Sequence, residues 1–372
     1  MSQLVCSTCR ATYPLNDVRW KCDCGGALDI EFAPVFDRKQ IKSRKPTIWR
    51  YREALPLDSD ANIVSLGEGF TPLVEMDFDG RTVLIKQDQL FPTGSYKDRG
   101  AALLISKVKE LGVQRVVEDS SGNAGCAVAA YCARAGVACE IFVPEDTAAA
   151  KLAQITAYGA TLKKVPGSRE DTARAALRAA AGRYYASHSW NPFFFHGTKT
   201  FAFEVCEQLG WKSPGTVIVP VGNGTLLLGC AIGFRELLGA GVIDRMPKLV
   251  GVQSANCAPL HRAFKDGADA VPHIEKKPTI AEGIAIAEPA RGMQVVEAVR
   301  RSGGEFVIVD DAEIEAALKD TCGKGFYIEP TSAATIAGVK KHVAGSNDGD
   351  TVLSVFTGHG LKAAEKVVKL LG

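Results

Sequence analysis

The sequence predicts an α/β fold of two doubly wound domains, each on a mostly parallel sheet, with a cleft between them and a small zinc-ribbon-like unit in front. Apolar strands alternate with amphipathic helices over most of the chain, glycine-containing loops follow several strands, and four cysteines lie within the N-terminal stretch. A length of 372 residues allows two domains and an appendage. We place the ribbon at 1–30, a large domain at 31–100 and 206–372, and a small α/β domain at 101–205.

The N-terminal unit is defined by Cys6, Cys9, Cys22 and Cys24. Cysteines paired on two turns suit tetrahedral zinc with four thiolate ligands. The second pair encloses a single residue, Asp23, where wider spacing is usual. Two alternatives therefore stay open, a ribbon that has lost its metal and cysteines that are simply small buried residues. Four thiolates leave no open coordination position, which argues against a catalytic zinc.

A charged connector at 31–61, with one short helix expected at 49–53, leads into the alternating series. Up to residue 200 the strands are expected at 82–86, 115–118, 140–143, 161–165 and 184–187, and the helices at 100–111, 124–135, 147–158 and 170–181. Beyond it the strands are expected at 217–221, 249–252, 306–309 and 352–356, and the helices at 198–209, 225–238, 311–322, 332–343 and 361–371. Alternation of this kind favours parallel strands with helices on both faces of each sheet.

The loops after these strands carry the residues with chemical potential, because such sheets bind ligands outside the carboxyl ends of their strands. Gly222-Asn223-Gly224-Thr225 joins a buried strand to a helix, where close backbone approach and free N–H groups suit a phosphate. An ordinary glycine turn is the alternative. Ser120-Ser121-Gly122-Asn123-Ala124-Gly125 is a second such loop, whose serines and asparagine could instead cap the helix.

Lys97 lies where the turn residues Pro92 and Gly94 give way to a helix. The positive end of the helix dipole disfavours an ammonium group, so we expect the pKa of Lys97 to be lowered. A lysine that loses its proton easily can form a Schiff base. The alternative is a solvated lysine at a frayed helix start.

Composition excludes several classes of function. A formal charge of +2 argues against a nucleic-acid surface as the main activity. No run approaches the length of a membrane span, and the N-terminus lacks the pattern of a secretion signal. Eleven cysteines, an odd number, fit free thiols in the cytoplasm better than a disulfide scaffold.

Six motifs occur in the order used by threonine synthase, a pyridoxal-phosphate (PLP) enzyme of the tryptophan-synthase-β group, also called fold type II. They are Gly67-Glu68-Gly69-Phe70-Thr71-Pro72-Leu73, Thr93-Gly94-Ser95-Tyr96-Lys97-Asp98-Arg99-Gly100, the Ser120 loop, the Gly222 loop, Glu329-Pro330-Thr331-Ser332 and Thr357-Gly358-His359-Gly360-Leu361-Lys362. The chain resembles this family from about Ser65 to its C-terminus. The resemblance implies a homodimer with PLP in the cleft and a small amino-acid substrate.

The resemblance also implies a role for each matched residue. Lys97 would hold PLP as a Schiff base and take the α-proton of the substrate. The other cofactor contacts would be Asn123 at the ring hydroxyl, Gly222, Asn223, Gly224 and Thr225 at the phosphate, and Thr357 at the pyridine nitrogen. Substrate contacts are expected from Thr71, Ser121, Ala124 and Lys199.

The implied reaction eliminates phosphate from O-phosphohomoserine and adds water to give L-threonine. One segment differs from the family pattern: threonine synthases carry a phosphate-binding arginine where this chain has Phe193 to Phe195. His196 or Lys199 could take its place, or the substrate could lack a phosphate. Thr279 to Ala285 also resembles the dehydratase branch. The alternatives are therefore a hydroxyamino-acid dehydratase, ammonia-lyase or β-replacement enzyme, and a ribbon-bearing binding protein without catalysis, against which the intact Lys97 argues.

Overall fold

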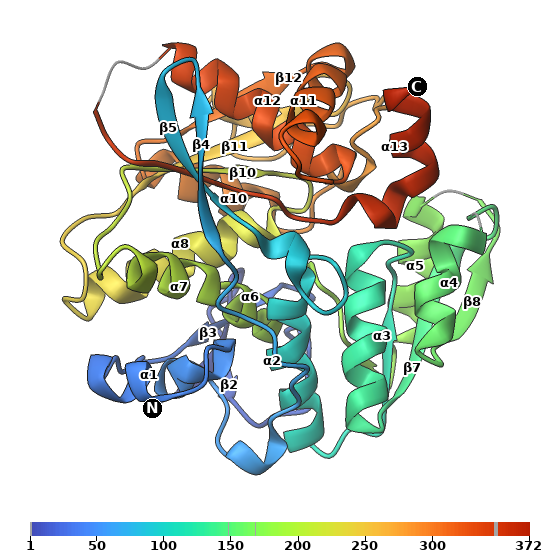
Figure 1. Cartoon of the computed structure of the whole chain (residues 1–372). Helices are drawn as coiled ribbons and strands as arrows, with labels where there is room; N and C mark the ends of the chain where they lie inside the picture. The colour runs from blue at the N-terminus through green and yellow to red at the C-terminus, as the bar shows by residue number, and fades with distance from the viewer. Residues whose placement is uncertain (1, 148, 168, 346–348) are drawn as a thin grey trace. The chain divides into compact units, whose positions relative to one another are not determined.

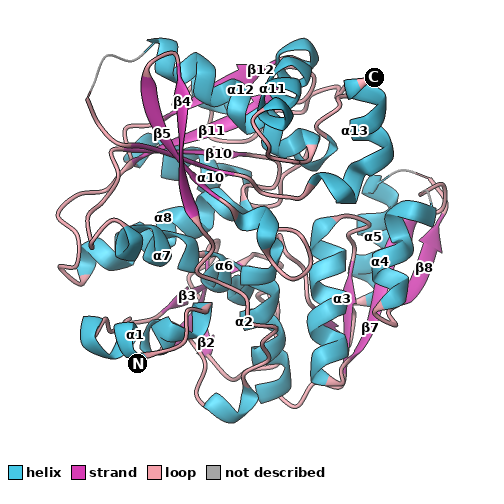
Figure 2. Cartoon of the chain, in the orientation of Figure 1, coloured by secondary structure: helices cyan, strands magenta, loops and turns pink. Residues whose placement is uncertain are grey.

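The computed structural model describes residues 2–147, 149–167, 169–345 and 349–372. Two compact units make up the chain, and each is built from two separate stretches of sequence (Figures 1 and 2). Unit 1 comprises Met1–Phe70 and Lys97–Thr200, and unit 2 comprises Thr71–Tyr96 and Phe201–Gly372. In the described ranges, no helix is both long and apolar enough to cross a membrane.

Unit 1 begins with a three-stranded antiparallel sheet in the order β2-β1-β3, formed by β1 (Gln3–Cys6), β2 (Thr12–Pro14) and β3 (Leu28–Glu31). Trp20 anchors this ribbon to the rest of unit 1. Its ring makes edge-to-face contacts with Tyr185 at 5.0 Å and with Trp190 at 5.9 Å between centroids. The expected ribbon-like unit is therefore present, and it packs onto the α/β part of unit 1.

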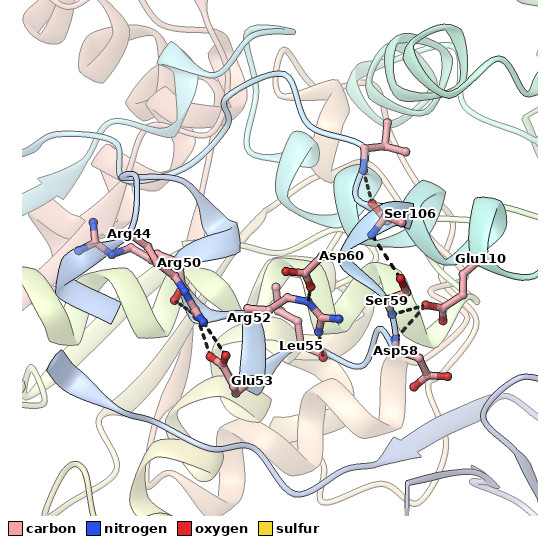
Figure 3. Close-up of polar contacts among 12 residues, drawn as sticks. Arg44, Arg50, Arg52, Glu53, Leu55, Asp58, Ser59, Asp60, Ser106 and Glu110 are labelled. Carbon is pink, nitrogen blue, oxygen red and sulfur yellow. Dashed lines mark hydrogen bonds and ion pairs between the residues drawn. The ribbon is translucent and has the colours of Figure 1, made fainter. Parts of the chain in front are cut away.

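The connector after the ribbon forms α1 (Arg38–Ser43), which Asp37 caps, and the 3₁₀ helices η1 (Ile48–Ala54) and η2 (Asp60–Asn62). Figure 3 shows the ion pairs that brace it. The Arg44 guanidinium binds both carboxylate oxygens of Glu53, at 2.6 and 2.5 Å, and Arg52 pairs with Asp60. A bidentate pair of this kind fixes the relative direction of the two side chains.

The end of the connector is fastened to helix α2 (Lys97–Glu110). The Glu110 carboxylate accepts hydrogen bonds from the backbone N–H groups of Asp58 and Ser59 at 2.8 and 3.0 Å (Figure 3). The Ser106 hydroxyl accepts another from the N–H of Val64 at 2.8 Å. These contacts explain why residues 31–70 belong to unit 1, whereas the sequence-based division assigned them to the large domain.

The second sheet of unit 1 has four parallel strands in the order β8-β7-β6-β9. They are β6 (Arg115–Glu118), β7 (Ala138–Pro144), β8 (Thr161–Val165) and β9 (Tyr184–Tyr185). The helices are α2, α3 (Asn123–Ala135), α4 (Ala149–Ala157), α5 (Arg169–Ala179) and α6 (Pro192–Thr198). Helix α3 packs on β7 and against α2, α5 covers β6 to β8, and α6 packs along α2. Small alanine side chains on α2 and α3 let these helices approach closely.

Unit 2 contains a six-stranded sheet in the order β12-β11-β10-β13-β5-β4. Its strands are β4 (Leu73–Phe78), β5 (Arg81–Lys86), β10 (Thr216–Pro220), β11 (Lys248–Ser254), β12 (Glu305–Val309) and β13 (Val352–Val355). Every pair is parallel except β4 with β5. These two form a hairpin because Asp79 and Gly80 both adopt positive φ, as a two-residue hairpin turn requires. The mostly parallel architecture is confirmed.

Helices cover both faces of this sheet, as Figure 1 shows. One side carries α8 (Thr225–Gly239), α9 (Pro259–Lys265) and α10 (Gly292–Arg301), and the other carries α12 (Pro330–Gly345) with α11 (Asp311–Gly323) packed on it. The remaining elements are α7 (Thr200–Gln208), η3 (Asp88–Leu90), η4 (Glu282–Ile284), η5 (Gly360–Ala363) and α13 (Ala364–Leu371). All five residues of β10 are buried, which explains the apolar run Val217–Val219 at its centre.

Candidate active site

Three loops of unit 2 meet at one edge of the six-stranded sheet. They follow β5, β10 and β13, and β13 lies between the other two strands. The N–H of Tyr96 donates to the carbonyl of Thr357 at 3.0 Å, and the N–H of His359 donates to the carbonyl of Gly94 at 2.9 Å. The segment immediately before Lys97 is therefore tied to the loop that carries Thr357, at the carboxyl edge where parallel sheets bind ligands.

In the Gly222–Thr225 loop, neither Gly222 nor Gly224 has room for a side chain. A Cβ atom on Gly222 would lie 2.8 Å from the carbonyl oxygen of Gly283, and one on Gly224 would lie 2.2 Å from Val295 Cγ2. Gly224 has a φ of 73° and no side chain caps α8 after it. The first turn of a long helix is thus presented by backbone alone, which suits a phosphate group.

Thr357 is buried at the end of β13 with its hydroxyl 3.1 Å from that of Ser332. The Ser332 hydroxyl also accepts the backbone N–H of Thr357 at 2.9 Å. Nearby Ser95, which pairs with Gly358 in a β-bridge, has a fully buried hydroxyl with no partner in the described ranges. Buried polar atoms are normally hydrogen-bonded, so an unpaired hydroxyl at this edge fits a polar ligand. The backbone amides of the Gly222–Thr225 loop and the hydroxyls of Ser95 and Thr357 therefore fit PLP in the kind of polar group that they offer.

Thr71, predicted to contact substrate, lies in unit 2 with its hydroxyl donating to Asp88 at 2.7 Å. Its carbonyl accepts from the buried Lys86 ammonium at 2.7 Å, which also pairs with Glu204 at 2.9 Å. This network fixes the backbone at the start of β4. The contact between Thr71 and substrate stays a prediction.

Lys97 is the first residue of α2, so the predicted helix starts three positions earlier than the pattern indicated. Its Nζ lies 5.9 Å from the centroid of the Phe194 ring. The ring reaches this position because Gly100 has no side chain, and a Cβ there would lie 2.2 Å from Phe194 Cε1. Gly197 permits the same closeness, since its Cβ would lie 2.2 Å from the carbonyl oxygen of Arg99. Helices α2 and α6 therefore place an aromatic ring beside the predicted catalytic amine.

The Ser120–Gly125 loop follows β6 and turns tightly into α3. A Cβ on Gly125 would lie 1.8 Å from the carbonyl oxygen of Ser120, so only glycine allows the turn. Gly122 occupies the cap position, and within the described ranges no side chain hydrogen-bonds there to cap α3, so the capping alternative is wrong. Ser121 and Asn123 are half-buried and Ala124 is buried. Backbone amides at this helix start suit a carboxylate.

Sequence reasoning missed a buried acid–base pair in unit 1. Glu118, the last residue of β6, lies 2.7 Å from Nδ1 of His188, which follows β9. The residues are 70 positions apart in sequence, and they meet because β6 and β9 are neighbours in the sheet. Burial raises the pKa of Glu118 well above its usual range and lowers the pKa of His188 well below its own.

The two side chains expected to replace an arginine, His196 and Lys199, contact each other. Lys199 is fully buried, with Nζ 3.0 Å from Nδ1 of His196 and 5.1 Å from the centroid of Phe32. A different cation acts on the acid–base pair: the positive charge of Arg169, at the start of α5, contributes to lowering the pKa of His188. No periodic or motif signal in the sequence identified Arg169.

The four N-terminal cysteines converge, with their sulfur atoms all within 4.8 Å of one another. Cys6 lies 3.5 Å from Cys24, and Cys9 lies 3.5 Å from Cys22. The Cys6 sulfur accepts backbone N–H groups from Thr8 and Cys9. Amides directed at a sulfur stabilise its thiolate form, and four converging thiolates match tetrahedral zinc, so these residues fit a structural zinc ion.

Comparison with known proteins gives a consistent result. Residues 64–358 match the family described as pyridoxal-phosphate dependent enzyme. The threonine synthase of Methanocaldococcus jannaschii is 37% identical, covering 98% of this chain and 94% of that protein. The threonine synthase of Mycobacterium leprae is 36% identical, covering 86% and 89%.

Solved structures share the fold. The processed form of threonine deaminase isoform 2 from Solanum lycopersicum superposes with a TM-score of 0.70 at 22% identity, covering 88% of this chain and 90% of that one. Maize serine racemase superposes with a TM-score of 0.69 at 21% identity, covering 81% and 92%. With the family match and the curated relatives, this likeness shows that the chain belongs to the pyridoxal-phosphate-dependent enzymes of fold type II, in the group of the threonine synthases.

Proposed function

We propose that this protein is a PLP-dependent lyase of the threonine synthase type, which removes phosphate from O-phosphohomoserine and adds water to give L-threonine. One observation carries the proposal: threonine synthases are 34–37% identical over 98–99% of the chain. That span includes the ribbon as well as both α/β sheets.

Bound PLP supplies an electron sink that makes the α-proton of an amino acid acidic. In this proposal the N–H groups of the Gly222–Thr225 loop hold its phosphate, and the Thr357 hydroxyl meets its pyridine nitrogen. A hydroxyl leaves that nitrogen largely unprotonated, which favours elimination over transamination. Asn123 meets the ring hydroxyl.

The remaining roles concern the substrate. The Lys97 amine anchors the cofactor and then accepts the α-proton as general base. Backbone amides at the start of α3, with the Ser121 hydroxyl and Ala124, orient the α-carboxylate. Lys199 is fully buried with its Nζ 3.0 Å from Nδ1 of His196, so its predicted contact with substrate would act through that ring.

A second candidate is a hydroxyamino-acid dehydratase, and a specific observation favours it. The neutral Phe194 ring lies beside Lys97, in the segment where threonine synthases carry an arginine, and Lys199 is buried against His196 and Phe32. A phosphate without a charge-assisted partner loses about 1.5–3 kcal/mol. An uncharged leaving group, such as a hydroxyl, avoids that loss.

A substrate panel tests the two candidates. Purified protein with PLP is incubated with O-phosphohomoserine, L-serine and L-threonine, and phosphate, threonine, ammonia and 2-oxo acid are measured together. Equimolar phosphate and threonine from O-phosphohomoserine supports the first candidate. Ammonia and 2-oxo acid from serine or threonine, without phosphate release, supports the second and overturns the first.

We also propose a structural zinc ion held by the four N-terminal cysteines, supported by the convergence of their sulfurs.

A cytoplasmic location is supported by the cysteines, which are all free of disulfides in the described ranges. A homodimer is proposed from the resemblance to the family, and light scattering of the purified protein tests it.

A further inference from the structure

We propose that His188 is the acid that protonates the leaving oxygen of the substrate. In this role Glu118 orients the His188 ring and returns a proton to it. The inference rests on the proposed elimination reaction and assigns a role to two residues outside every motif of the sequence. Oε1 of Glu118 and Nδ1 of His188 are 2.7 Å apart, a distance at which a proton passes directly between them.

The pair lies on the same side of unit 1 as Lys97. One aromatic ring joins them: the Phe194 centroid is 5.9 Å from Lys97 Nζ and 6.2 Å from the centroid of His188. The position of this ring is determined by the close contact of α2 with α6 at Gly100. Lys97 and His188 thus both lie beside the Phe194 ring, the first able to take a proton and the second able to give one.

Burial of Glu118 is the second observation. Its side chain is fully buried, and its Oε2 has no hydrogen-bond partner within the part of the chain that the structure describes. A buried polar oxygen left unpaired costs about 1–3 kcal/mol, and more if it is charged. The structure therefore keeps a carboxyl group at this position at the expense of stability, as functional sites do.

The surroundings hold Glu118 in its acid form. Burial has the largest effect on its pKa, and the nearby charges of Asp119 and Cys139 raise it further. The positive charge of Lys97 and a hydrogen bond from the backbone of Asp119 act in the opposite direction and lower the pKa of Glu118. A neutral Glu118 donates its O–H to Nδ1 of His188.

The surroundings of His188 keep its ring neutral. Burial lowers its pKa first, and the positive charges of Lys97 and Arg169 lower it further. A neutral imidazole that accepts at Nδ1 carries its own proton on Nε2. That nitrogen is therefore the one able to donate to substrate.

The proton transfers balance within these side chains. In the step that expels phosphate, which follows removal of the α-proton, Cβ of the substrate gives its proton to the Lys97 amine and its electron pair to a new double bond between Cβ and Cγ. The carbon–oxygen bond breaks with its pair going to oxygen, the Nε2 proton of His188 moves to that oxygen, and the Glu118 proton moves to Nδ1. Lys97 becomes a cation in the same step in which Glu118 becomes an anion, so the net charge of these side chains does not change. The water that adds later releases a proton, which restores the pair.

The test compares leaving groups. Glu118→Gln keeps a donor to Nδ1 but has no proton to give, and Glu140→Gln, on the neighbouring strand β7, is the matched control. O-phosphohomoserine is compared with 2-amino-4-chlorobutyrate, which has the same carbon chain and releases chloride without a proton. We expect Glu118→Gln to lower kcat about 10²-fold on the phosphate ester and less than about threefold on the chloride, with KM unchanged.

The outcomes separate the two proposals. Equal losses on both substrates, or no loss, would overturn the acid role of the pair. A wild-type protein that leaves O-phosphohomoserine intact but acts on serine refutes the proposed function alone, and the comparison then uses serine with β-chloroalanine.

A second readout needs no turnover. Nitrogen-15 NMR of labelled histidine in the cofactor-free protein, assigned with His188→Gln, should show His188 neutral with its proton on Nε2 from about pH 5 to about pH 8. The proton on Nδ1, or titration near the ordinary histidine pKa of about 6.5, would contradict the inference.

Discussion

Gly224 shows how one residue combines two constraints at the proposed phosphate site. Its φ of 73° is in the region that favours glycine, and a Cβ would overlap Val295. Gly224→Ala should therefore shift the start of α8, destabilise the fold by roughly 1–3 kcal/mol and weaken PLP binding. Fluorescence titration with PLP measures the binding. Gly239→Ala is the control, since Gly239 lies in the same helix and its Cβ would meet nothing within 4 Å. Equal effects of the two substitutions would refute the assignment.

Lys97 allows the most direct test at this scale. Lys97→Ala should abolish turnover, with a loss of at least about 10³-fold, because it removes both the anchor of the cofactor and the general base. PLP should still bind, but dialysis should remove it. Lys109→Ala alters an exposed lysine on the same helix, whose Nζ donates to the carbonyl of Ala61, and should leave activity intact. Retained activity in Lys97→Ala would exclude this lysine.

At the scale of elements, the alternating strands and helices were predictable because periodicity and turn residues act locally. Helix α6 was not predicted. All seven of its residues are buried, so it has no apolar face to recognise. Asn191, which caps it, and Pro192 in its first turn were the signals available.

The predicted helix at 198–209 corresponds to α7 (Thr200–Gln208), and only its first residue, Thr198, belongs to α6, which ends there. The site loops were predictable as strand–helix junctions, whereas the pairing of Glu118 with His188 was not. It depends on β6 lying beside β9, and strand order is a long-range property.

The ribbon is an element whose removal can be tested separately. Chelation of zinc should loosen residues 1–30, seen as rapid proteolysis there, and leave the absorbance of bound PLP unchanged. The reason is that four thiolates supply most of the stability of so small a sheet. Cys9→Ser should act like the chelator, whereas Cys322→Ser, at a half-buried cysteine of α11, should not. Immediate loss of the PLP spectrum would show that the ribbon supports the cofactor site.

At the scale of the whole molecule, each sheet brings its loops together by strand order. In unit 2 the loops after β5, β13 and β10 lie next to one another because these strands are neighbours. In unit 1 the same holds for the loops after β6 and β9. At these edges the Ser95 hydroxyl and Oε2 of Glu118 are buried and have no hydrogen-bond partner among the described residues. These oxygens therefore lower the free energy of unfolding at the places where ligands are proposed to bind. A bound ligand or a bound proton offsets that loss.

The pH dependence of unfolding measures this cost for Glu118. Burial raises its pKa in the folded protein, so the folded state binds the proton more tightly than the unfolded state does. The stabilising contribution is complete below the unfolded pKa of about 4.3 and is lost as pH rises, at up to about 1.4 kcal/mol per pH unit. Glu118→Gln has no such proton, so its stability relative to wild type should increase from about pH 5 to about pH 8.

Urea unfolding of wild type and variant, with saturating PLP, gives this difference directly. His188 is present in both proteins, so the loss of stability that its neutral ring causes as pH falls through its unfolded pKa of about 6.5 is common to both and largely cancels. Glu140→Gln removes a carboxylate that pairs with Arg183 at 2.7 Å and should show no gain in relative stability as pH rises. A difference between Glu118→Gln and wild type that stays constant with pH would mean that Glu118 is ionised in the folded protein, and a buried carboxylic acid could then not supply the proton for elimination.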